Sequence, residues 1–542
     1  MSTCASIAMT TAPGTVLELE QFRLRYPGSQ AWTLDGLDLR LKPGERLALV
    51  GPSGCGKSTV ARAALQLLPA GSTCEGGLSL NGRDPRKLRL ADLRTLRGES
   101  VGLVFQDPMT RLNPLMTVGG HLLDTLRAHK PSMSDGDRLK RAEELLEQVG
   151  IGAARFHAYP HEFSGGMRQR LAIALAIALR PPLVIADEPT TSLDVAVAGQ
   201  VMAALRELCE ELGSALLLIS HDLAMAHRWC ERMAVLDGGR VVEINRSDVV
   251  LTYPSSRVGQ RLLTAARARE GGSTPEPPDA DTVLAVEELR CWHNLGGPPW
   301  NPRWLKAVDG ISFELKAGET LGVVGGSGCG KSTLCRALMG LTPIRGGRVQ
   351  LLGQDLLQLR GNRARQVRRT IQMVFQDPLA CLNPAMSVVD AIADPLLIHH
   401  LATPLAAREQ ACRLMERVGL APADRFQNRL PRQLSGGQQQ RVAIARALAL
   451  KPKVLICDES VSMLDAEIQA EVLALLRQLQ RDLELAMIFI THDLSVASGF
   501  CHRLIVLNQG HVVEEGPGDR LLNQPQADIT RTLVDACPRL PN

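Results

Sequence analysis

Short apolar runs of strand length recur along the chain, and each gives way to polar residues. The runs at 46–50, 183–186 and 216–219 are almost continuously apolar, which is typical of strands covered on both faces. A glycine-rich loop follows the first run, and a helix is expected over 58–68. Strands that alternate with helices predict a mostly parallel α/β sheet. Residues 109–163 carry a charged helical pattern instead, which predicts a helical subdomain inserted into the α/β core.

The whole pattern occurs twice. GPSGCGKSTV at 51–60 recurs as GGSGCGKSTL at 325–334, and the phrases VFQDP, SGG and HDL recur in the same order, with offsets of 270–274 residues. Such a repeat indicates a tandem duplication of one domain. We therefore predict domains over 16–264 and 283–525. Residues 265–282 connect them, and their composition, rich in Pro, Gly and acidic residues, predicts a flexible linker.

The composition argues against several classes of protein. The 542 residues are 45% hydrophobic and 22% charged, as in globular proteins with a sizeable core. The formal charge of +4 is too small for a dedicated nucleic-acid binder. No apolar run reaches the roughly 18 residues that a membrane helix needs. The 13 cysteines show neither a C-x-x-C pair nor metal-ligand spacing, which indicates reduced thiols in a cytoplasmic protein.

A phosphate-binding loop follows the first buried strand of each domain. The pattern Gly51-x-x-x-x-Gly56-Lys57-Ser58 stands between a predicted strand and a predicted helix, which is the context it requires. Its glycines let backbone N–H groups converge on a phosphate at a helix N-terminus. The lysine would reach the β- and γ-phosphates of ATP, and the serine hydroxyl would bind Mg²⁺. The residues assigned to the two loops are Gly51, Ser53, Gly54, Gly56, Lys57, Ser58 and Thr59, and Gly325, Ser327, Gly328, Gly330, Lys331, Ser332 and Thr333.

A pair of carboxylates ends one apolar run in each domain. Asp187-Glu188 and Asp458-Glu459 stand at the end of a predicted strand, where open α/β sheets place ligand chemistry. The first carboxylate suits Mg²⁺, directly or through water, and the second would polarise the attacking water as a general base. Either pair alone could be a solvated strand end. Both pairs, however, stand between the SGG and HDL phrases, which favours the catalytic interpretation.

The segments FSGGMRQR at 163–170 and LSGGQQQR at 434–441 resemble the signature of ABC transporter nucleotide-binding domains. The resemblance covers nearly the whole chain. It implies two P-loop (RecA-like) α/β domains, each with an antiparallel β subdomain and an inserted α-helical subdomain. It also implies a head-to-tail sandwich, in which each ATP lies between the P-loop of one domain and the signature of the other. The signature residues are Ser164, Gly165 and Gly166, and Ser435, Gly436, Gly437 and Gln438.

The same resemblance assigns further residues to each site: a Q-loop glutamine that senses Mg²⁺ and the γ-phosphate, a switch histidine that contacts the γ-phosphate, and a D-loop aspartate across the interface. In this sequence they are Gln106 and Gln376, His221 and His492, and Asp194 and Asp465. The expected metal contacts are Ser58, Gln106 and Asp187 in the first domain, and Ser332, Gln376 and Asp458 in the second. With both glutamates and both histidines present, we expect both sites to hydrolyse ATP.

Adenine needs an aromatic face to stack on. Tyr26, at the end of a predicted strand upstream of the first P-loop, matches the aromatic residue of the family's A-loop. In the second domain the segment Cys291-Trp292-His293 stands at the corresponding place. Counting from the apolar positions assigns His293, whereas one residue of slippage assigns Trp292. A core aromatic residue is an alternative interpretation.

The phrases FQDPMTRLNP and FQDPLACLNP resemble the peptide/nickel import branch of the family, which carries dipeptides, oligopeptides, glutathione or nickel. The resemblance implies an ATPase subunit at the cytoplasmic face of the inner (plasma) membrane, bound peripherally to two transmembrane permease subunits that work with an extracytoplasmic solute-binding protein. The sequence lacks the cysteine cluster of some relatives, so no iron–sulfur cluster is expected. The alternative is a non-transport tandem ABC ATPase that acts on the ribosome or DNA. The short, acidic connection argues against RNA contact, and no nucleic-acid partner is expected.

Overall fold

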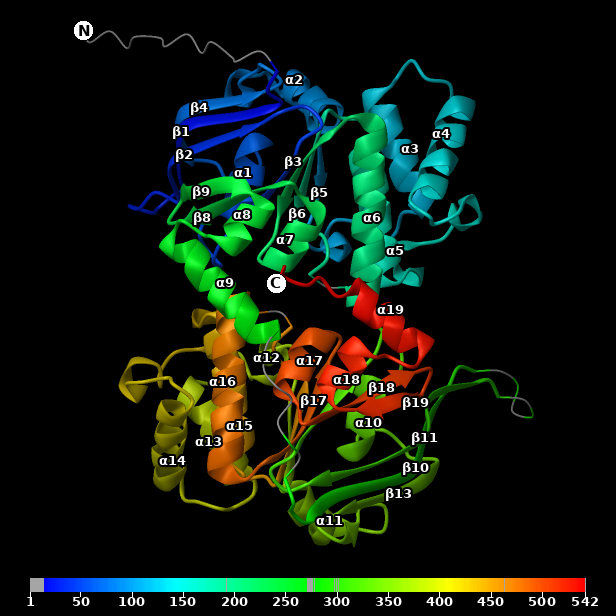
Figure 1. Ribbon diagram of the computed structural model, residues 1–542, viewed down its shortest axis with the longest axis vertical. Helices are drawn as coiled ribbons and strands as arrows, with labels where there is room; N and C mark the ends of the chain where they lie inside the picture. Colours follow the sequence, from blue (N-terminus) through cyan, green and yellow to red (C-terminus); the bar gives the residue numbers. More distant parts are fainter. Residues whose placement is uncertain are drawn as a thin grey trace. The chain divides into compact units, whose positions relative to one another are not determined.

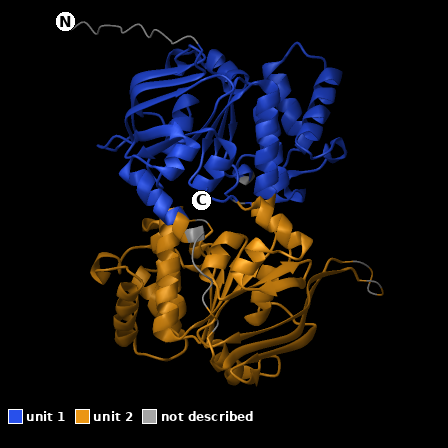
Figure 2. Cartoon of the chain, in the orientation of Figure 1, with its two compact units in different colours: residues 1–193, 197–266, 538–542 blue, residues 194–196, 267–537 orange. Residues whose placement is uncertain are grey.

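The chain forms two compact units in the computed structural model (Figures 1 and 2). One unit comprises residues 1–193, 197–266 and 538–542, and the other comprises residues 194–196 and 267–537. The structure describes residues 14–191, 193–270, 276, 278–296, 298, 300, 302–462 and 464–541. Each unit has its own sheets and its own hydrophobic clusters.

The first unit is built around a sheet of six strands, which pair in the order β5 (Val101–Val104), β6 (Leu183–Asp187), β7 (Ala215–Ile219), β3 (Arg46–Val50), β8 (Arg232–Asp237) and β9 (Arg240–Arg246). All neighbouring strands are parallel except β8 and β9. Leu216 and Leu218 pack into the hydrophobic cluster on one face of this sheet, and Leu217 packs into the cluster on the other face. Burial on both faces confirms the strands that the continuous apolar runs predicted.

A second sheet and a set of helices cover the two faces. The second sheet is antiparallel and has the strand order β2 (Leu34–Leu41), β1 (Leu17–Arg25) and β4 (Thr73–Leu80). It shares one hydrophobic cluster with α1 (Lys57–Ala64). The cluster on the opposite face of the central sheet takes in α6 (Val195–Leu212), α7 (Leu223–Trp229), α8 (Ser247–Thr252) and α9 (Arg257–Glu270).

Between β5 and β6 the chain leaves the sheet and forms a helical subdomain. It contains α3 (Val118–His129), α4 (Asp135–Gln148) and α5 (Gly165–Ile177) (Figure 1). Side chains cap the starts of these helices: Thr117 accepts a hydrogen bond from the backbone N–H of Gly120, and Ser134 accepts one from that of Asp137, both across 3.1 Å. The predicted helical insertion is confirmed.

The second unit repeats this architecture. Its central sheet has the order β15 (Ile371–Val374), β16 (Val454–Asp458), β17 (Ala486–Thr491), β12 (Thr320–Val324), β18 (Arg503–Asn508) and β19 (His511–Gly516). Its antiparallel sheet has the order β11 (Trp304–Lys316), β10 (Thr282–Asn294), β13 (Gly346–Leu351) and β14 (Gln354–Asp355). Its helices are α10 (Lys331–Leu338), α11 (Gly361–Arg368), α12 (Pro378–Cys381), α13 (Val388–Ile398), α14 (Pro404–Arg417), α15 (Gly436–Leu448), α16 (Ala466–Leu483), α17 (Leu494–Phe500), α18 (Gly518–Asn523) and α19 (Asp528–Ala536). The matching strand order confirms the predicted pair of α/β domains.

The connection between the units differs from the predicted flexible linker over 265–282. Helix α9 runs to Glu270, so residues 265–270 are helical. Leu262, Leu263 and Ala266 are buried at helical spacing, and this packing extends the helix into a segment whose composition is polar. Residues 271–275 and 277 of the predicted linker lie outside the described residues. Within the described part of the chain, every helix is too short or too polar to cross a lipid bilayer.

Candidate active sites

A tight loop joins β3 to α1 in the first unit, and its counterpart joins β12 to α10 in the second. Gly56 ends the first loop with a φ of +108°, and Gly330 ends the second with a φ of +113°, a region that favours glycine. A Cβ atom on Gly51 would lie 2.3 Å from the carbonyl oxygen of Leu236. Because no side chain fits there, the loop packs tightly against the neighbouring strand. It presents bare backbone at the start of a helix, as an anion site requires.

The lysine of each loop is buried and held by backbone carbonyls. Nζ of Lys57 donates hydrogen bonds to the carbonyl oxygens of Gly51, across 2.7 Å, and Pro52, across 2.9 Å. Lys331 makes the same two contacts in its own loop, at 2.7 and 2.9 Å. Both acceptors are neutral, and an ammonium group carries three hydrogens. The loop therefore holds a buried positive charge that suits a phosphate oxygen.

A hydroxyl and a carboxylate meet beside the first lysine. Oγ of Ser58, in the first turn of α1, donates to Oδ1 of Asp187 at the end of β6 across 2.9 Å. Burial, together with the neighbouring charge of Glu188, raises the pKa of Asp187, although the Ser58 hydrogen bond opposes this shift. Burial and the charge of Glu459 likewise raise the pKa of Asp458 in the second unit. A cation that binds at these carboxylates would relieve the cost of their burial.

Three side chains converge on Glu188, the residue after β6, and two of them come from the loops that follow β5 and β7. Nε2 of Gln106 donates to its Oε2 across 2.9 Å, Nδ1 of His221 lies 3.2 Å from its Oε1, and the Thr191 hydroxyl donates to Oε2 across 3.1 Å. Burial alone would raise the pKa of Glu188, but the hydrogen bond and charge of His221, with the hydrogen bond from Thr191, lower it. The backbone of Glu188 has a φ of +47°, a strained value for a residue other than glycine. The site thus holds an ionised carboxylate in a fixed position.

The second unit repeats this arrangement around Glu459, whose φ is +45°. Nε2 of Gln376 donates to Oε2 of Glu459 across 2.9 Å, and Nδ1 of His492 lies 3.6 Å from the same oxygen. Burial would lower the pKa of His492, but the hydrogen bond and charge of Glu459 prevail and raise it. Burial would raise the pKa of Glu459, but the hydrogen bond and charge of His492 together lower it. The pair in the second unit therefore favours a carboxylate beside a charged imidazole.

The two signature segments begin helices α5 and α15. Oγ of Ser164 and of Ser435 accepts a backbone hydrogen bond at the start of its helix, across 3.4 Å in each case. A Cβ atom on Gly437 would lie 2.4 Å from Cγ2 of Ile468 in α16, whereas one on Gly436 would come no closer than 3.7 Å to Leu464. The second glycine is therefore required by helix packing, and the first leaves backbone accessible at the helix start.

The two D-loop aspartates stand at the starts of long helices. Asp465 caps α16 by accepting a hydrogen bond from the backbone N–H of Ile468 across 3.0 Å. Asp194 directly precedes α6 and is 9% exposed. The expected action of these aspartates and of the signature serines on a nucleotide held by the other domain stays a prediction.

A ring approaches the threonine of each phosphate loop. The Tyr26 hydroxyl lies 3.2 Å from Oγ1 of Thr59, and Nε2 of His293 lies 3.4 Å from Oγ1 of Thr333. Trp292 is engaged elsewhere in the second unit, because its Nε1 donates to Asp309 across 3.2 Å. His293 therefore occupies the position equivalent to that of Tyr26, which supports the assignment made by counting apolar positions.

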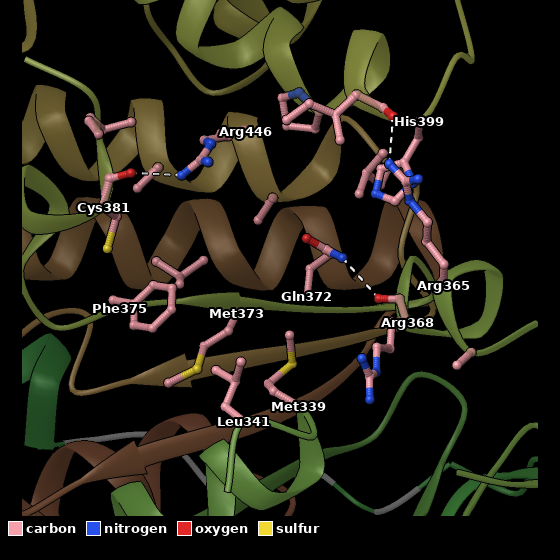
Figure 3. A pocket seen from close by; sticks show the side chains of 18 of the residues that line it. Met339, Leu341, Arg365, Arg368, Gln372, Met373, Phe375, Cys381, His399 and Arg446 are labelled. Carbon is pink, nitrogen blue, oxygen red and sulfur yellow. Dashed lines mark hydrogen bonds between the residues drawn. The ribbon is translucent and has the colours of Figure 1, made fainter. Parts of the chain in front are cut away.

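A separate cavity of about 750 Å³ lies in the second unit between β15 and helices α11, α13 and α15 (Figure 3). Met339, Leu341, Met373 and Phe375 form its apolar wall, and Phe375 directly precedes the Q-loop glutamine. None of the described residues that line it is acidic. The lining arginines are Arg360, Arg365, Arg368 and Arg446, of which Arg365 donates to the carbonyl of Ile398 and Arg446 to that of Cys381, both across 2.8 Å.

Comparison with known proteins identifies the family. A sequence model described as ABC transporter matches residues 34–191 and 308–462, one segment in each unit. The chain belongs to the ABC transporter family. It is 41% identical over 94% of its length to the peptidoglycan transport ATP-binding protein YejF of Agrobacterium fabrum, of which 93% is covered. It is 38% identical over 95% of its length to the glutathione import ATP-binding protein GsiA of Salmonella choleraesuis, of which 88% is covered.

The ABC domains of this chain have the groups that ATP binding requires. Each phosphate loop has bare backbone at a helix start, and its lysine ammonium donates hydrogen bonds to two neutral carbonyl oxygens. Beside the first lysine, the Ser58 hydroxyl and the half-buried Asp187 carboxylate supply the hard oxygen ligands that Mg²⁺ prefers. The residues therefore fit a nucleotide with its metal ion.

Thr191 is a contact that sequence reasoning missed. Its hydroxyl binds the Glu188 carboxylate, and the residue lies three positions after the glutamate. The second ABC domain has Ser462 at the same offset, and that hydroxyl donates to the backbone carbonyl of Glu459 across 2.6 Å. A hydroxyl side chain at the same offset in both repeats is the sequence signal that could have found this pair.

Proposed function

We propose that the chain is the ATP-hydrolysing subunit that energises an ABC importer for peptides or related small solutes, of the dipeptide, oligopeptide, glutathione or nickel type. The observation that carries the proposal is the repeated site, in which a buried loop lysine lies near a strand-end carboxylate that is bound by a glutamine and a histidine. Relatives named for peptidoglycan transport and glutathione import support this class of solute.

Glu188 and Glu459 act as general bases in this proposal. Each accepts a proton from the water that attacks the γ-phosphate, and the lowered pKa of each keeps it ionised for that role. His221 and His492 hold these carboxylates in position and contact the γ-phosphate. Lys57 and Lys331 bind the β- and γ-phosphates.

Mg²⁺ would be held in the first site by Ser58, Gln106 and Asp187, where it would neutralise charge on the phosphates. Ser332, Gln376 and Asp458 would hold it in the second site. Because Gln106 and Gln376 already bind the catalytic glutamates, each glutamine is suited to report on both the metal and the base.

Each ATP would be completed by the signature of the other domain. Ser164, Gly165 and Gly166 would face the nucleotide held by the second P-loop, and Ser435, Gly436, Gly437 and Gln438 the one held by the first. The open backbone at Gly436 supports this role, because N–H groups at the start of α15 suit an anion. Asp194 and Asp465 would act at the same interface, and Tyr26 and His293 would stack on adenine.

The partners in this proposal are two transmembrane permease subunits and an extracytoplasmic solute-binding protein, with the ATPase at the cytoplasmic face of the inner membrane. The cavity shown in Figure 3 is a candidate docking site for one permease. Its apolar wall and its arginines suit a permease segment that combines apolar and acidic side chains. No nucleic acid and no iron–sulfur cluster form part of the proposal.

Reconstitution with a candidate pair of permease subunits tests this function. The assay uses right-side-out vesicles that contain ATP, with the binding protein added outside. These vesicles should accumulate a labelled dipeptide, glutathione or a peptidoglycan peptide. Vesicles with the Glu188→Gln/Glu459→Gln variant should not accumulate it. Failure of the wild-type chain to co-purify with either permease from mild detergent would contradict a transport role.

A further inference from the structure

The first unit contains a basic cavity far from its phosphate loop. The cavity has a volume of about 510 Å³ and lies where β3 and β8 begin, near the end of α7 and the start of α8. The phosphate loop follows the other end of β3, so the length of that strand, about 15 Å, separates the two places. Its lining includes Arg46, Arg206, His227, Arg228, Trp229 and Glu231.

Buried donors without partners gather at this cavity. Nine buried side-chain nitrogen or oxygen atoms in the described part of the chain have no hydrogen-bond partner, and four of them belong to Arg46, Arg206, His227 and Trp229. Nε of both arginines and Nε1 of Trp229 are donors that can never accept. Trp229 is only 7% exposed, so solvent does not readily satisfy its N–H group. The missing group is therefore an acceptor.

The charges around the cavity also favour an acceptor that is anionic. Five arginines line it, against the carboxylates of Glu231 and Asp248. Arg46 pairs with Glu231 and with Glu210, which lies outside the lining, and Arg246 pairs with Asp248 across 2.9 Å. These pairs leave Nε of Arg46 without a partner. Arg206 also lies in an ion pair with Glu210, across 3.6 Å, and Arg232 pairs with Glu45. Carboxylates of the protein still leave Nε of Arg46 and Nε1 of Trp229 without an acceptor.

Trp229 positions two of the guanidinium groups. Cζ of Arg206 lies 5.7 Å from the centroid of the Trp229 ring, and Cζ of Arg228 lies 5.4 Å from it. Contact with an aromatic face holds a guanidinium in a defined place. A planar guanidinium matches the oxygens of a phosphate group, which it can bind with two parallel hydrogen bonds.

The second unit provides an internal comparison. The residues at the matching positions of the repeat are Thr320 for Arg46, Arg477 for Arg206, Ser498 for His227, Gly499 for Arg228, Phe500 for Trp229, and Pro517 and Gly518 for Arg246 and Ser247. Here Arg477 donates to the carbonyl of Gly499, and Thr320 accepts a hydrogen bond from Gln480 across 2.7 Å. A Cβ atom on Gly518 would lie 2.5 Å from Cα of Ser498, so the two helices pack directly. Arg477 and Gln480 thus have acceptors within the second unit, unlike Nε of Arg46 and Nε1 of Trp229 in the first.

We propose that the basic cavity of the first unit is a third anion site, distinct from both ATP sites, that binds a phosphomonoester or polyphosphate group. Its volume suits a small phosphorylated molecule. The oxygens of such a group accept hydrogen bonds from Nε of Arg46 and Nε1 of Trp229, which the protein leaves without hydrogen-bond partners. Arg206, whose Nε lies 3.6 Å from Oε1 of Glu210, adds a further guanidinium. The group belongs either to a free metabolite or to a phospholipid headgroup.

Calorimetry with inorganic pyrophosphate tests the site on the full chain. The Lys57→Ala/Lys331→Ala background removes phosphate binding at both P-loops. Saturable binding of about one pyrophosphate per chain is expected there, and Arg206→Leu should weaken it by about tenfold or more because a hydrogen bond to a charged group is lost. Arg477→Leu, the matched change in the second unit, should leave binding unchanged. Trp229→Phe introduces the residue found at the matching position of the second unit, Phe500, and removes the indole N–H group. This variant also should weaken binding, and it tests the site if Arg206→Leu does not fold.

Vesicles distinguish the two sources of phosphate. A phospholipid headgroup is supported if the chain co-sediments with phosphatidic acid vesicles but not with phosphatidylcholine vesicles. Trp229→Phe should then abolish this co-sedimentation. Pyrophosphate binding without vesicle binding would support a free metabolite. The proposal is overturned if the chain binds neither pyrophosphate nor the vesicles. It is also overturned if Arg206→Leu and Trp229→Phe bind either probe as well as the chain without these substitutions.

Discussion

Nε2 of Gln106 donates a hydrogen bond to Oε2 of Glu188 across 2.9 Å, and Gln376 makes the same bond to Glu459 at the same distance. Gln106 follows β5, where the chain leaves the central sheet for the helical subdomain, and Glu188 follows β6. A movement of the helical subdomain is therefore expected to alter the hydrogen bonding of the catalytic carboxylate. In the proposed function, this bond would give a permease docked on the subdomain a direct route to hydrolysis.

Replacing both glutamates should separate binding from hydrolysis. In Glu188→Gln/Glu459→Gln the amide oxygen still accepts the glutamine hydrogen bond, but it does not take a proton from water at neutral pH. ATP turnover should fall by about 100-fold or more, the usual contribution of a general base, while ATP still binds. Phosphate release and equilibrium ATP binding measure the two effects. Glu144→Gln, on the surface of α4, is the control, and wild-type turnover in the double variant would contradict the assignment.

Each P-loop lysine should serve one nucleotide. Lys57→Ala removes the ammonium group held by the carbonyls of Gly51 and Pro52, and it should reduce the number of bound ATP molecules per chain from two to one. Lys331→Ala should do the same, and the double variant should bind none. Titration with a fluorescent ATP analogue gives the number, with the exposed Lys140→Ala as the control. If either single variant still binds two ATP molecules, the prediction that each P-loop lysine serves one nucleotide is wrong.

His293 and Trp292 should respond differently to substitution. In the Lys57→Ala background, which isolates the second site, His293→Ala should weaken ATP binding by about 2- to 10-fold because a stacking ring is lost. Trp292→Ala should retain that affinity but lower the free energy of unfolding by about 1 kcal/mol, since its bond to Asp309 is lost. ATP titration and thermal unfolding measure the two changes. The opposite pattern would assign adenine stacking to Trp292.

Replacing the two glycines of the second signature should affect different properties: stability at Gly437 and ATP turnover at Gly436. The Cβ atom of Gly437→Ala would meet Ile468 at 2.4 Å, so α15 and α16 must separate, at a cost of about 1–3 kcal/mol in the free energy of unfolding. Gly436→Ala has room and should leave the Tm unchanged. Its methyl group would stand at the open start of α15, so ATP turnover should fall. If Gly436→Ala is stable and its ATP turnover is unchanged, the prediction that the signature segment contacts the nucleotide is wrong.

Charge reversal at the cavity of Figure 3 should weaken permease binding. Arg365→Glu places a carboxylate in a lining that has no acidic residue among those described, and it would repel an acidic permease segment. The yield of permease that co-purifies in mild detergent should fall severalfold. Arg413→Glu, an exposed charge reversal on α14 outside the lining, should keep the wild-type yield. Equal loss in both variants would contradict a specific docking site.

The contiguous parts of the sites could be predicted from the sequence. The phosphate loops and the strand-end carboxylates each lie within a few residues, and the apolar runs beside them define the strands that carry them. The glutamines and histidines were assigned through the family resemblance. Their contacts with Glu188 and Glu459 depend on how β5, β6 and β7 pair in the first unit and how β15, β16 and β17 pair in the second. Residues far apart in the chain determine these pairings together.

The choice between His293 and Trp292 needed the structure. Strand β10 pairs with β11 through several register shifts, one of them between Cys291 and Trp292. A bulge of this kind interrupts the alternation of inward and outward side chains, so counting apolar positions leaves two candidates. The distance from His293 to Thr333 supports His293, and its stacking on adenine stays a prediction.

The amino-acid sequence by itself determined the duplication, the alternating strands and helices, and the chemistry of both phosphate loops, because these follow from local patterns and from the repeat. Only the tertiary structure decided that α9 continues to Glu270, that Thr191 binds Glu188, and that unpaired donors surround a cavity in the first unit. These features arise where segments distant in the sequence pack together. Burial and hydrogen bonding between such segments depend on the whole fold, and no local pattern records them.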